Sequence, residues 1–268
     1  MKQATRKGAV RVDLIPLDIL EQLNRGEIET ANLIEGLAID QIALMRSVLT
    51  SLGREAYIQP ILEAIEALPK ATFNTLNHAI GRTLHRLISY HRDDALWRSI
   101  ATHSSDTIRC WACYVVASRD LAMDEYLEQI RPFATDHHFG VREISWLSMR
   151  SHIIEHLDLS LALLSDWATD DNPYIRRFAT EATRPRGVWC QHIDRLKANP
   201  SLAGDLLEPL KSEPVKYVQN SVANWLNDAS KTAPDFVISL IHRWQTESPT
   251  NATAYIAKRA LRSLNKKS

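Results

Sequence analysis

The chain has 268 residues and carries 32 acidic and 32 basic side chains, so its formal net charge is zero. This balance excludes a protein that attracts nucleic acid through its global charge, and any such surface has to come from local clusters of Arg and Lys. Three cysteines are too few for a disulfide framework and indicate reduced thiols in the cytoplasm.

The first 16 residues are predicted to form an N-terminal extension. They are basic but lack the apolar core of a signal peptide, and the chain has no apolar run of about 18 residues that would span a membrane. From residue 17 to 268 we expect a single all-α domain. Apolar residues recur there every three or four positions, beginning with Leu17, Leu20 and Leu23, and strand-like alternation is essentially absent.

A weak internal repeat organises these helices. In each unit a polar turn is followed by a β-branched residue and then a marker side chain, and the markers Arg109, Arg142, Arg176 and Gln219 are 33, 34 and 43 residues apart. This period is typical of HEAT-like helix pairs, so we predict an α-solenoid with a concave face. The recurring Arg residues have two interpretations: a basic track along that face, or ion pairs with acids of neighbouring repeats.

Positive charge is concentrated in the stretch 174–189, where four arginines surround a single acid, Glu181. Pro185 is expected to end the helix there, and Gly187 to permit a turn that presents Trp189. An acid among arginines beside an exposed aromatic ring suits a site for phosphate and base. The alternative is an intrahelical salt bridge with a core Trp. The four arginines are Arg176, Arg177, Arg184 and Arg186.

Two further helices pair an acid with a tryptophan. Glu143 and Trp146 are one helical turn apart, and Trp225 shares a face with Asp228. Taken alone, each Trp is more often a core residue than a site residue. Three such pairings in one chain are less easily dismissed as core packing.

Three stretches carry a resemblance to a known family: 32–41, 176–186 and 218–231. They are similar to the bacterial HEAT-like DNA alkylation repair glycosylases, and nearer to the AlkC branch than to the AlkD branch. The resemblance implies a curved solenoid whose concave face holds double-stranded DNA with alkylated bases. It also implies excision of N3- or N7-alkylated purines without a metal or other cofactor, by a cytoplasmic protein that is expected to be a monomer.

The resemblance also implies roles for single residues. Glu181 and Asp228 match catalytic acids of the family. Where the AlkC branch has a further catalytic Glu, this chain has His138, so Glu143 becomes the third candidate acid. The predicted contacts to the lesion or its sugar are Trp146, Trp189 and Trp225. The predicted DNA-binding residues are Arg142, Arg176, Arg177, Arg184, Arg186 and Lys231.

Other functions compete with excision. The chain could be a non-catalytic HEAT-repeat binder of damaged or branched DNA, or a protein-interaction scaffold, which is the commonest role of helical repeats. Metal chemistry is not expected. Cys110 and Cys113 form a lone C-x-x-C motif without a second pair, which favours core packing. His152 and His156 match an inverted zinc-peptidase pattern but lack a recognisable third ligand.

Overall fold

The computed structural model describes residues 6–264, and over that range it contains α-helices and 3-10 turns and no strand. The all-α prediction is therefore confirmed for these residues. The chain folds into two compact units, residues 1–121 with 136–148 and residues 122–135 with 149–268. No helix among the described residues is long and apolar enough to cross a membrane.

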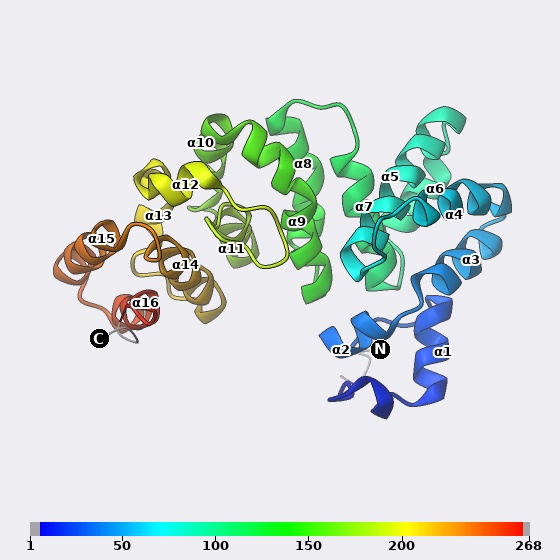
Figure 1. Ribbon diagram of the computed structural model, residues 1–268, viewed down its shortest axis with the longest axis horizontal. Coiled ribbons are helices and arrows are strands. Elements are labelled where there is room, and N and C mark those ends of the chain that lie inside the picture. The colour runs from blue at the N-terminus through cyan, green and yellow to red at the C-terminus, as the bar shows by residue number, and fades with distance from the viewer. Residues whose placement is uncertain (1–5, 265–268) are drawn as a thin grey trace. The chain divides into compact units, whose positions relative to one another are not determined.

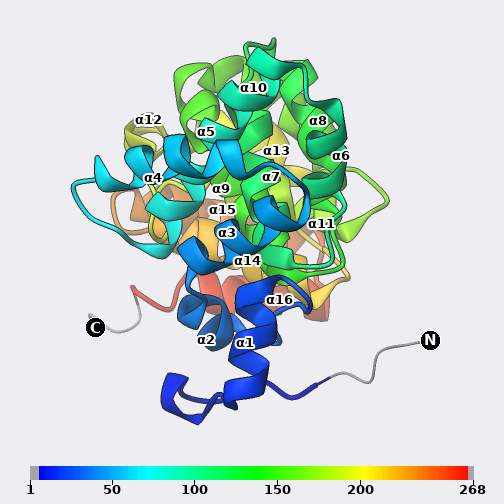
Figure 2. The same cartoon turned by 90° about the vertical axis from the view of Figure 1, so that its right-hand side faces the viewer.

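The first unit is built from short helix pairs (Figure 1). Helix α5 packs along α7, and α1 packs against α3. Figure 2 turns the helices of this unit toward the viewer. The α5–α7 approach requires Gly81, since a Cβ there would lie 2.6 Å from the Trp111 carbonyl oxygen. Its helices are α1 (Leu17–Arg25), α2 (Leu33–Ala38), α3 (Gln41–Ser51), α4 (Ile58–Glu66), α5 (Phe73–His91), α6 (Asp94–Ala101), α7 (Asp106–Ala117) and the first part of α9 (Phe139–Glu155).

Helix α7 is the centre of the first unit. Every residue from Asp106 to Val116 is buried, so the helix has neighbours on all sides. Cys110 and Cys113 lie within it as free thiols, and burial raises the pKa of both. The C-x-x-C motif is therefore part of the core, as the sequence predicted.

The second unit places α14 between α11 and α16. The fully buried indoles of Trp225 on α14 and Trp244 on α15 fill its core. The larger helices are α8 (Met123–Ala134), the rest of α9, α10 (Leu157–Trp167), α11 (Pro173–Ala182), α14 (Lys216–Ala229), α15 (Pro234–Glu247) and α16 (Asn251–Ala260). The short α12 (Asp194–Ala198) and α13 (Gly204–Leu207) connect α11 to α14.

The repeat markers share one hydrogen-bond pattern. Each donates from its side chain to the backbone carbonyls six and five residues before it: Arg109 to His103 and Ser104, for example, and Gln219 to Glu213 and Pro214. Arg142 and Arg176 do the same in their own turns. The marker thus satisfies carbonyls that a tight turn leaves without a helical partner. The sequence repeat is therefore a repeat of turn structure.

The described part of the N-terminal extension is tied to the start of α2. Arg6 donates to both carboxylate oxygens of Glu35, at 2.5 and 2.6 Å, and the Asn32 amide donates to the Ala9 carbonyl. Residues 1–5 of the predicted extension lie outside the described range. The expectation of one continuous solenoid domain from residue 17 stays a prediction.

Candidate functional site

Glu181 and Asp228 converge on one guanidinium. Arg184 donates from Nη1 to Glu181 Oε2 at 3.2 Å, and its Nε and Nη2 lie 2.9 and 2.8 Å from Asp228 Oδ2. Both acids are only 4% exposed. Glu181 is the penultimate residue of α11, whereas Arg184 lies just beyond the helix, which ends at Ala182 before Pro185. Two acids 47 positions apart in sequence thus meet at one point of the second unit.

Further cations surround the same two acids. Arg177 Nη2 lies 3.6 Å from Glu181 Oε1, and Lys231 Nζ donates to Asp228 Oδ1 at 3.2 Å. Burial lowers the pKa of Arg184, but the two carboxylates outweigh this effect and raise it above its ordinary value. Three cations therefore face two acids, and we call these five residues the acid–arginine cluster.

A buried arginine holds the loop that follows the cluster. Arg150 on α9 is 3% exposed and donates to the backbone carbonyls of Ala182, Arg184 and Gln191 at 2.6 to 3.0 Å. Burial lowers its pKa. Its bonds pin both ends of the segment 184–191, so they fix the path of the loop. Sequence reasoning missed Arg150, because its partners lie 32 to 41 residues away.

Trp189 stands at the tip of this loop and is 70% exposed. Its φ of 61° is in the left-handed region that disfavours residues with a Cβ. A Cβ added to Gly187 would overlap Cys190 Sγ, so the loop needs glycine at that position. The structure therefore presents Trp189 to solvent, as the Gly187 turn predicted. Arg186 lies in the same loop and is half-buried.

Trp225 corrects the sequence prediction. It is 0% exposed, and its indole nitrogen donates to the Thr183 carbonyl at 3.0 Å. The face that Trp225 shares with Ser221 packs on α11, where Ser221 Oγ lies 2.5 Å from Thr180 Oγ1. The prediction that Trp225 contacts a lesion or its sugar is therefore wrong, because the ring is part of the core.

Arg176 and Arg142 serve the turns described above. Arg176 also forms a two-pronged ion pair with Glu213, at 2.7 and 2.8 Å, so each of its guanidinium nitrogens is bonded inside the protein. Arg109, buried at 5% exposure, pairs with Asp136 and Glu29 in the same way. For Arg109 and Arg176 the structure favours the ion-pair interpretation over the basic track.

A polar face runs beside the acid–arginine cluster. The Arg177 guanidinium stacks over the Tyr217 ring, 4.2 Å from its centroid. Asn220 accepts a hydrogen bond from Tyr255 of α16, and Asn224 accepts one from Arg262. The spacing of Tyr217, Asn220, Asn224 and Asp228 along α14 was a sequence signal for this face. Of these four residues, only Asp228 was a predicted site residue.

Glu143 and Trp146 lie in the first unit, on α9. The indole nitrogen of Trp146 donates to Glu143 Oε2 at 3.0 Å, and the ring is 6% exposed. The expected pairing on one helix face is therefore present. The role of Glu143 as a third acid and that of Trp146 as a contact to the lesion stay predictions.

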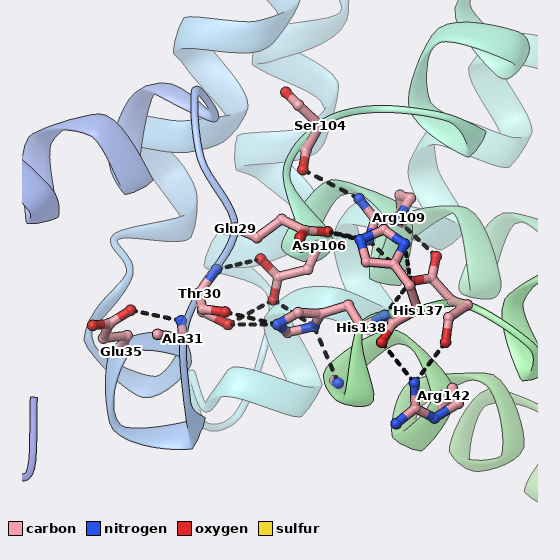
Figure 3. Close-up of polar contacts among 12 residues, drawn as sticks. Glu29, Thr30, Ala31, Glu35, Ser104, Asp106, Arg109, His137, His138 and Arg142 are labelled. Carbon is pink, nitrogen blue, oxygen red and sulfur yellow. Dashed lines mark hydrogen bonds and ion pairs between the residues drawn. The ribbon is translucent and has the colours of Figure 1, made fainter. Parts of the chain in front are cut away.

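His138 is a structural residue of the first unit (Figure 3). It is 8% exposed, and its Nε2 donates to the Thr30 carbonyl at 2.8 Å while its Nδ1 accepts from the Gly140 backbone at 3.2 Å. Asp106 binds both the backbone and the hydroxyl of Thr30, which completes the cluster. A cavity of about 740 Å³ lies beside it and is lined in part by His138, Phe139 and Arg142. His138 thus anchors the segment before α2 and supplies no carboxylate.

No group of three His, Cys, Asp or Glu side chains is placed to hold a metal ion within residues 6–264. In the zinc-like motif, His152 instead stacks on Tyr126, with 4.4 Å between the ring centroids.

Part of the chain is similar to a known protein family. Residues 141–264 match the model of the DNA alkylation repair enzyme family. The uncharacterised protein YhaZ of Bacillus subtilis (strain 168) is 37% identical over 123 residues, which are 46% of this chain and 34% of that protein. The chain thus matches about a third of the length of that relative.

Two solved structures share the fold. The alkylpurine DNA glycosylase AlkC of Pseudomonas fluorescens, bound to DNA containing an abasic site analogue, has a TM-score of 0.66 and 24% identity. The match covers 97% of this chain and 66% of that one. AlkD2 from Streptococcus mutans has a TM-score of 0.59 and 22% identity, with 76% of this chain and 97% of that one covered. Residues 141–264, a little under half of the chain, are thus similar to the DNA alkylation repair enzyme family, and the fold is the HEAT-like helical-repeat fold of AlkC and AlkD2.

Proposed function

We propose that this protein binds alkylated duplex DNA in the cytoplasm as a monomer and hydrolyses the N-glycosidic bond of N3- or N7-alkylated purines. The observation that best supports this proposal is the convergence of Glu181 and Asp228 on Arg184, beside the loop that presents Trp189. The family match covers all of these residues. Three free cysteines and the described helices, none of which could span a membrane, agree with this location.

The chemistry suits two carboxylates. An alkylated purine of this kind already carries a positive charge and departs as a neutral base, so the enzyme has to stabilise an oxocarbenium-like sugar and orient a water molecule. Glu181 and Asp228 would do both. The exposed indole of Trp189 would face the cationic base through its π-electrons.

The cations of the acid–arginine cluster control whether the two carboxylates can interact with the substrate. In the free protein Arg177, Arg184 and Lys231 pair with the two carboxylates. DNA phosphates would compete for these cations, since charge-assisted bonds from Arg to phosphate are also strong. Binding would then free carboxylate oxygens at the place where the deoxyribose lies.

Non-catalytic binding of damaged or branched DNA is the second candidate. Three cations against two largely buried acids leave a net positive cluster, which favours a phosphate over a cationic base. A scaffold that binds only proteins would show no salt-dependent affinity for DNA.

A base-release assay on methylated DNA separates the candidates. The wild-type protein is expected to release 3-methyladenine or 7-methylguanine, and Asp228→Asn to reduce the rate by about 100-fold or more while binding persists in a gel shift. The matched control is Asp158→Asn, which removes an acid that is also paired with an arginine, Arg195, but is exposed. Binding of linear or branched DNA without any released base would establish the second candidate and refute excision.

A further inference from the structure

Two arginines outside the acid–arginine cluster lie at the end of α16: Arg259 in its last turn, and Arg262 just beyond it. Within residues 6–264, no carboxylate forms an ion pair with Arg259 or Arg262. By contrast, Arg109, Arg176 and Arg184 each bind two acids or one acid through two nitrogens. The Arg259 Nε is buried and has no hydrogen-bond acceptor in this range. Among the described residues, these two half-buried guanidinium groups therefore have no carboxylate in direct contact.

Two amides of α14 border these arginines. The Asn224 Oδ1 accepts from Arg262 Nη2 at 3.0 Å, and the Asn220 Oδ1 accepts from the Tyr255 hydroxyl at 2.7 Å. The amide oxygens are thus bonded to α16 and to the turn that follows it, and no acceptor among the described residues takes the Nδ2 hydrogens. We call Asn220, Asn224, Arg259 and Arg262 the α16 donor row, because their remaining polar groups donate hydrogen bonds.

The α16 donor row continues directly from the acid–arginine cluster. Asn224 and Asp228 are four residues apart on α14, which is about 6 Å along the helix axis. Arg262 therefore lies about one helical turn from the point where Asp228 meets Arg184. Burial, and then the nearby charges of Arg259 and Arg184, lower the pKa of Arg262, while the charge of Asp228 offsets part of this effect. Arg262 therefore has two cations and one acid in its surroundings.

We propose that the α16 donor row binds a backbone phosphate of the DNA strand, immediately beside the deoxyribose that Glu181 and Asp228 would contact. A phosphodiester has only acceptor oxygens and a negative charge. It therefore matches a row of donors with two arginines that no carboxylate of residues 6–264 contacts. The inference rests on the proposed binding of DNA, but it does not require excision.

The test combines charge-removing variants with DNA in which single phosphates are neutral. A duplex with a stable abasic analogue is prepared with one methylphosphonate at each position around the analogue in turn. Wild type, Arg262→Gln and the control Arg243→Gln are compared. Arg243 is a cation of the same unit on α15, held by Glu208. Arg262→Lys retains the charge, and thermal melting shows whether each variant is folded.

We expect Arg262→Gln to weaken binding by about tenfold and to make the salt dependence shallower by about 0.9 in log–log slope. Arg243→Gln should change neither, and Arg262→Lys should restore most of the slope. One methylphosphonate next to the analogue should weaken binding by wild type but cause no further loss with Arg262→Gln.

Each other outcome is decisive. If wild type releases bases but a folded Arg262→Gln variant keeps the wild-type salt slope, the phosphate site is wrong and the proposed function stands. If wild type binds without release and the coupling to one phosphate is present, the phosphate site stands and excision is wrong. If wild type has no salt-dependent affinity for DNA, both are overturned.

Discussion

Arg184 binds Asp228 through two of its nitrogens, Nε and Nη2, across 44 positions of sequence. This pair joins the end of α11 to α14, and Arg184 reaches Glu181 at the same time. The central guanidinium therefore compensates two largely buried acids, and it is the residue on which the geometry of the acid–arginine cluster depends.

Removing Arg184 is expected to destabilise the protein. Arg184→Gln leaves Asp228 and Glu181 partly uncompensated, and the loss of one partner of a buried ion pair costs about 3–5 kcal/mol. Urea unfolding of the single variant and of Arg184→Gln with Asp228→Asn measures the effect. The double variant should be more stable than the single variant, since the buried charge is then removed. Equal losses of unfolding free energy in the single and the double variant would show that the broken ion pair does not cause the destabilisation.

The loop that presents Trp189 should depend on the Gly187–Cys190 contact. Gly187→Ala places a Cβ against Cys190 Sγ, so the loop has to shift. We expect base release and DNA affinity to fall, with little change in global stability, and Cys190→Ala to restore both in the double variant. Trp189 can be followed by ¹⁹F NMR of protein with fluorinated tryptophan. An unchanged Trp189 resonance in Gly187→Ala would contradict this prediction.

A variant of Arg176 tests whether the repeat marker stabilises the fold or contacts DNA. Arg176→Gln keeps a donor for the turn carbonyls, as Gln219 does in its own turn, but loses the ion pair with Glu213. The expected result is a loss of about 3 kcal/mol in unfolding free energy and an unchanged salt slope of DNA binding. A shallower slope in a folded variant would instead support the original expectation that Arg176 contacts DNA.

The acid stability of the first unit should depend on Asp93. The Arg54 guanidinium at 2.5 Å lowers the pKa of Asp93 to about 2, and Asp93 also accepts from the Leu96 backbone at the start of α6. Because the folded-state pKa lies below the unfolded value, this contribution is complete above about pH 4 and is lost as the pH falls toward 2. It amounts to about 2 kcal/mol. Unfolding curves of wild type and Asp93→Asn from pH 7 to 2 should converge at the acid end.

The sequence predicted the helices and the repeat more fully than the site. Apolar spacing is local, so the helices follow from it, and the markers Arg109 and Gln219 lie where the turn chemistry requires them. Trp189 and Trp225 show what the sequence could not predict about the site. Both belong to predicted acid–Trp pairings, but one stands on a glycine-dependent loop and the other packs on Thr183.

Long-range contacts explain what the sequence could not show. No local pattern marks Arg150, because its acceptors are backbone carbonyls of a distant loop. The meeting of Glu181 and Asp228 was an expectation of the family resemblance, and spacing alone would not have predicted it. The grouping of Arg259 and Arg262 with the amides of α14 likewise depends on the packing of α16 on α14, which the sequence did not predict.

The turn that follows each marker explains why the last marker, Gln219, carries no charge. The turn after Arg109 supplies Asp136, and the turn after Arg176 supplies Glu213. The turn after Gln219 is Ser248-Pro249-Thr250, which contains no acid. An arginine at the nearly buried position 219 would have no counter-ion there, whereas a neutral amide makes the same bonds to the backbone. For Arg109, Arg176 and Gln219, the charge of the marker therefore matches the composition of the turn that comes next.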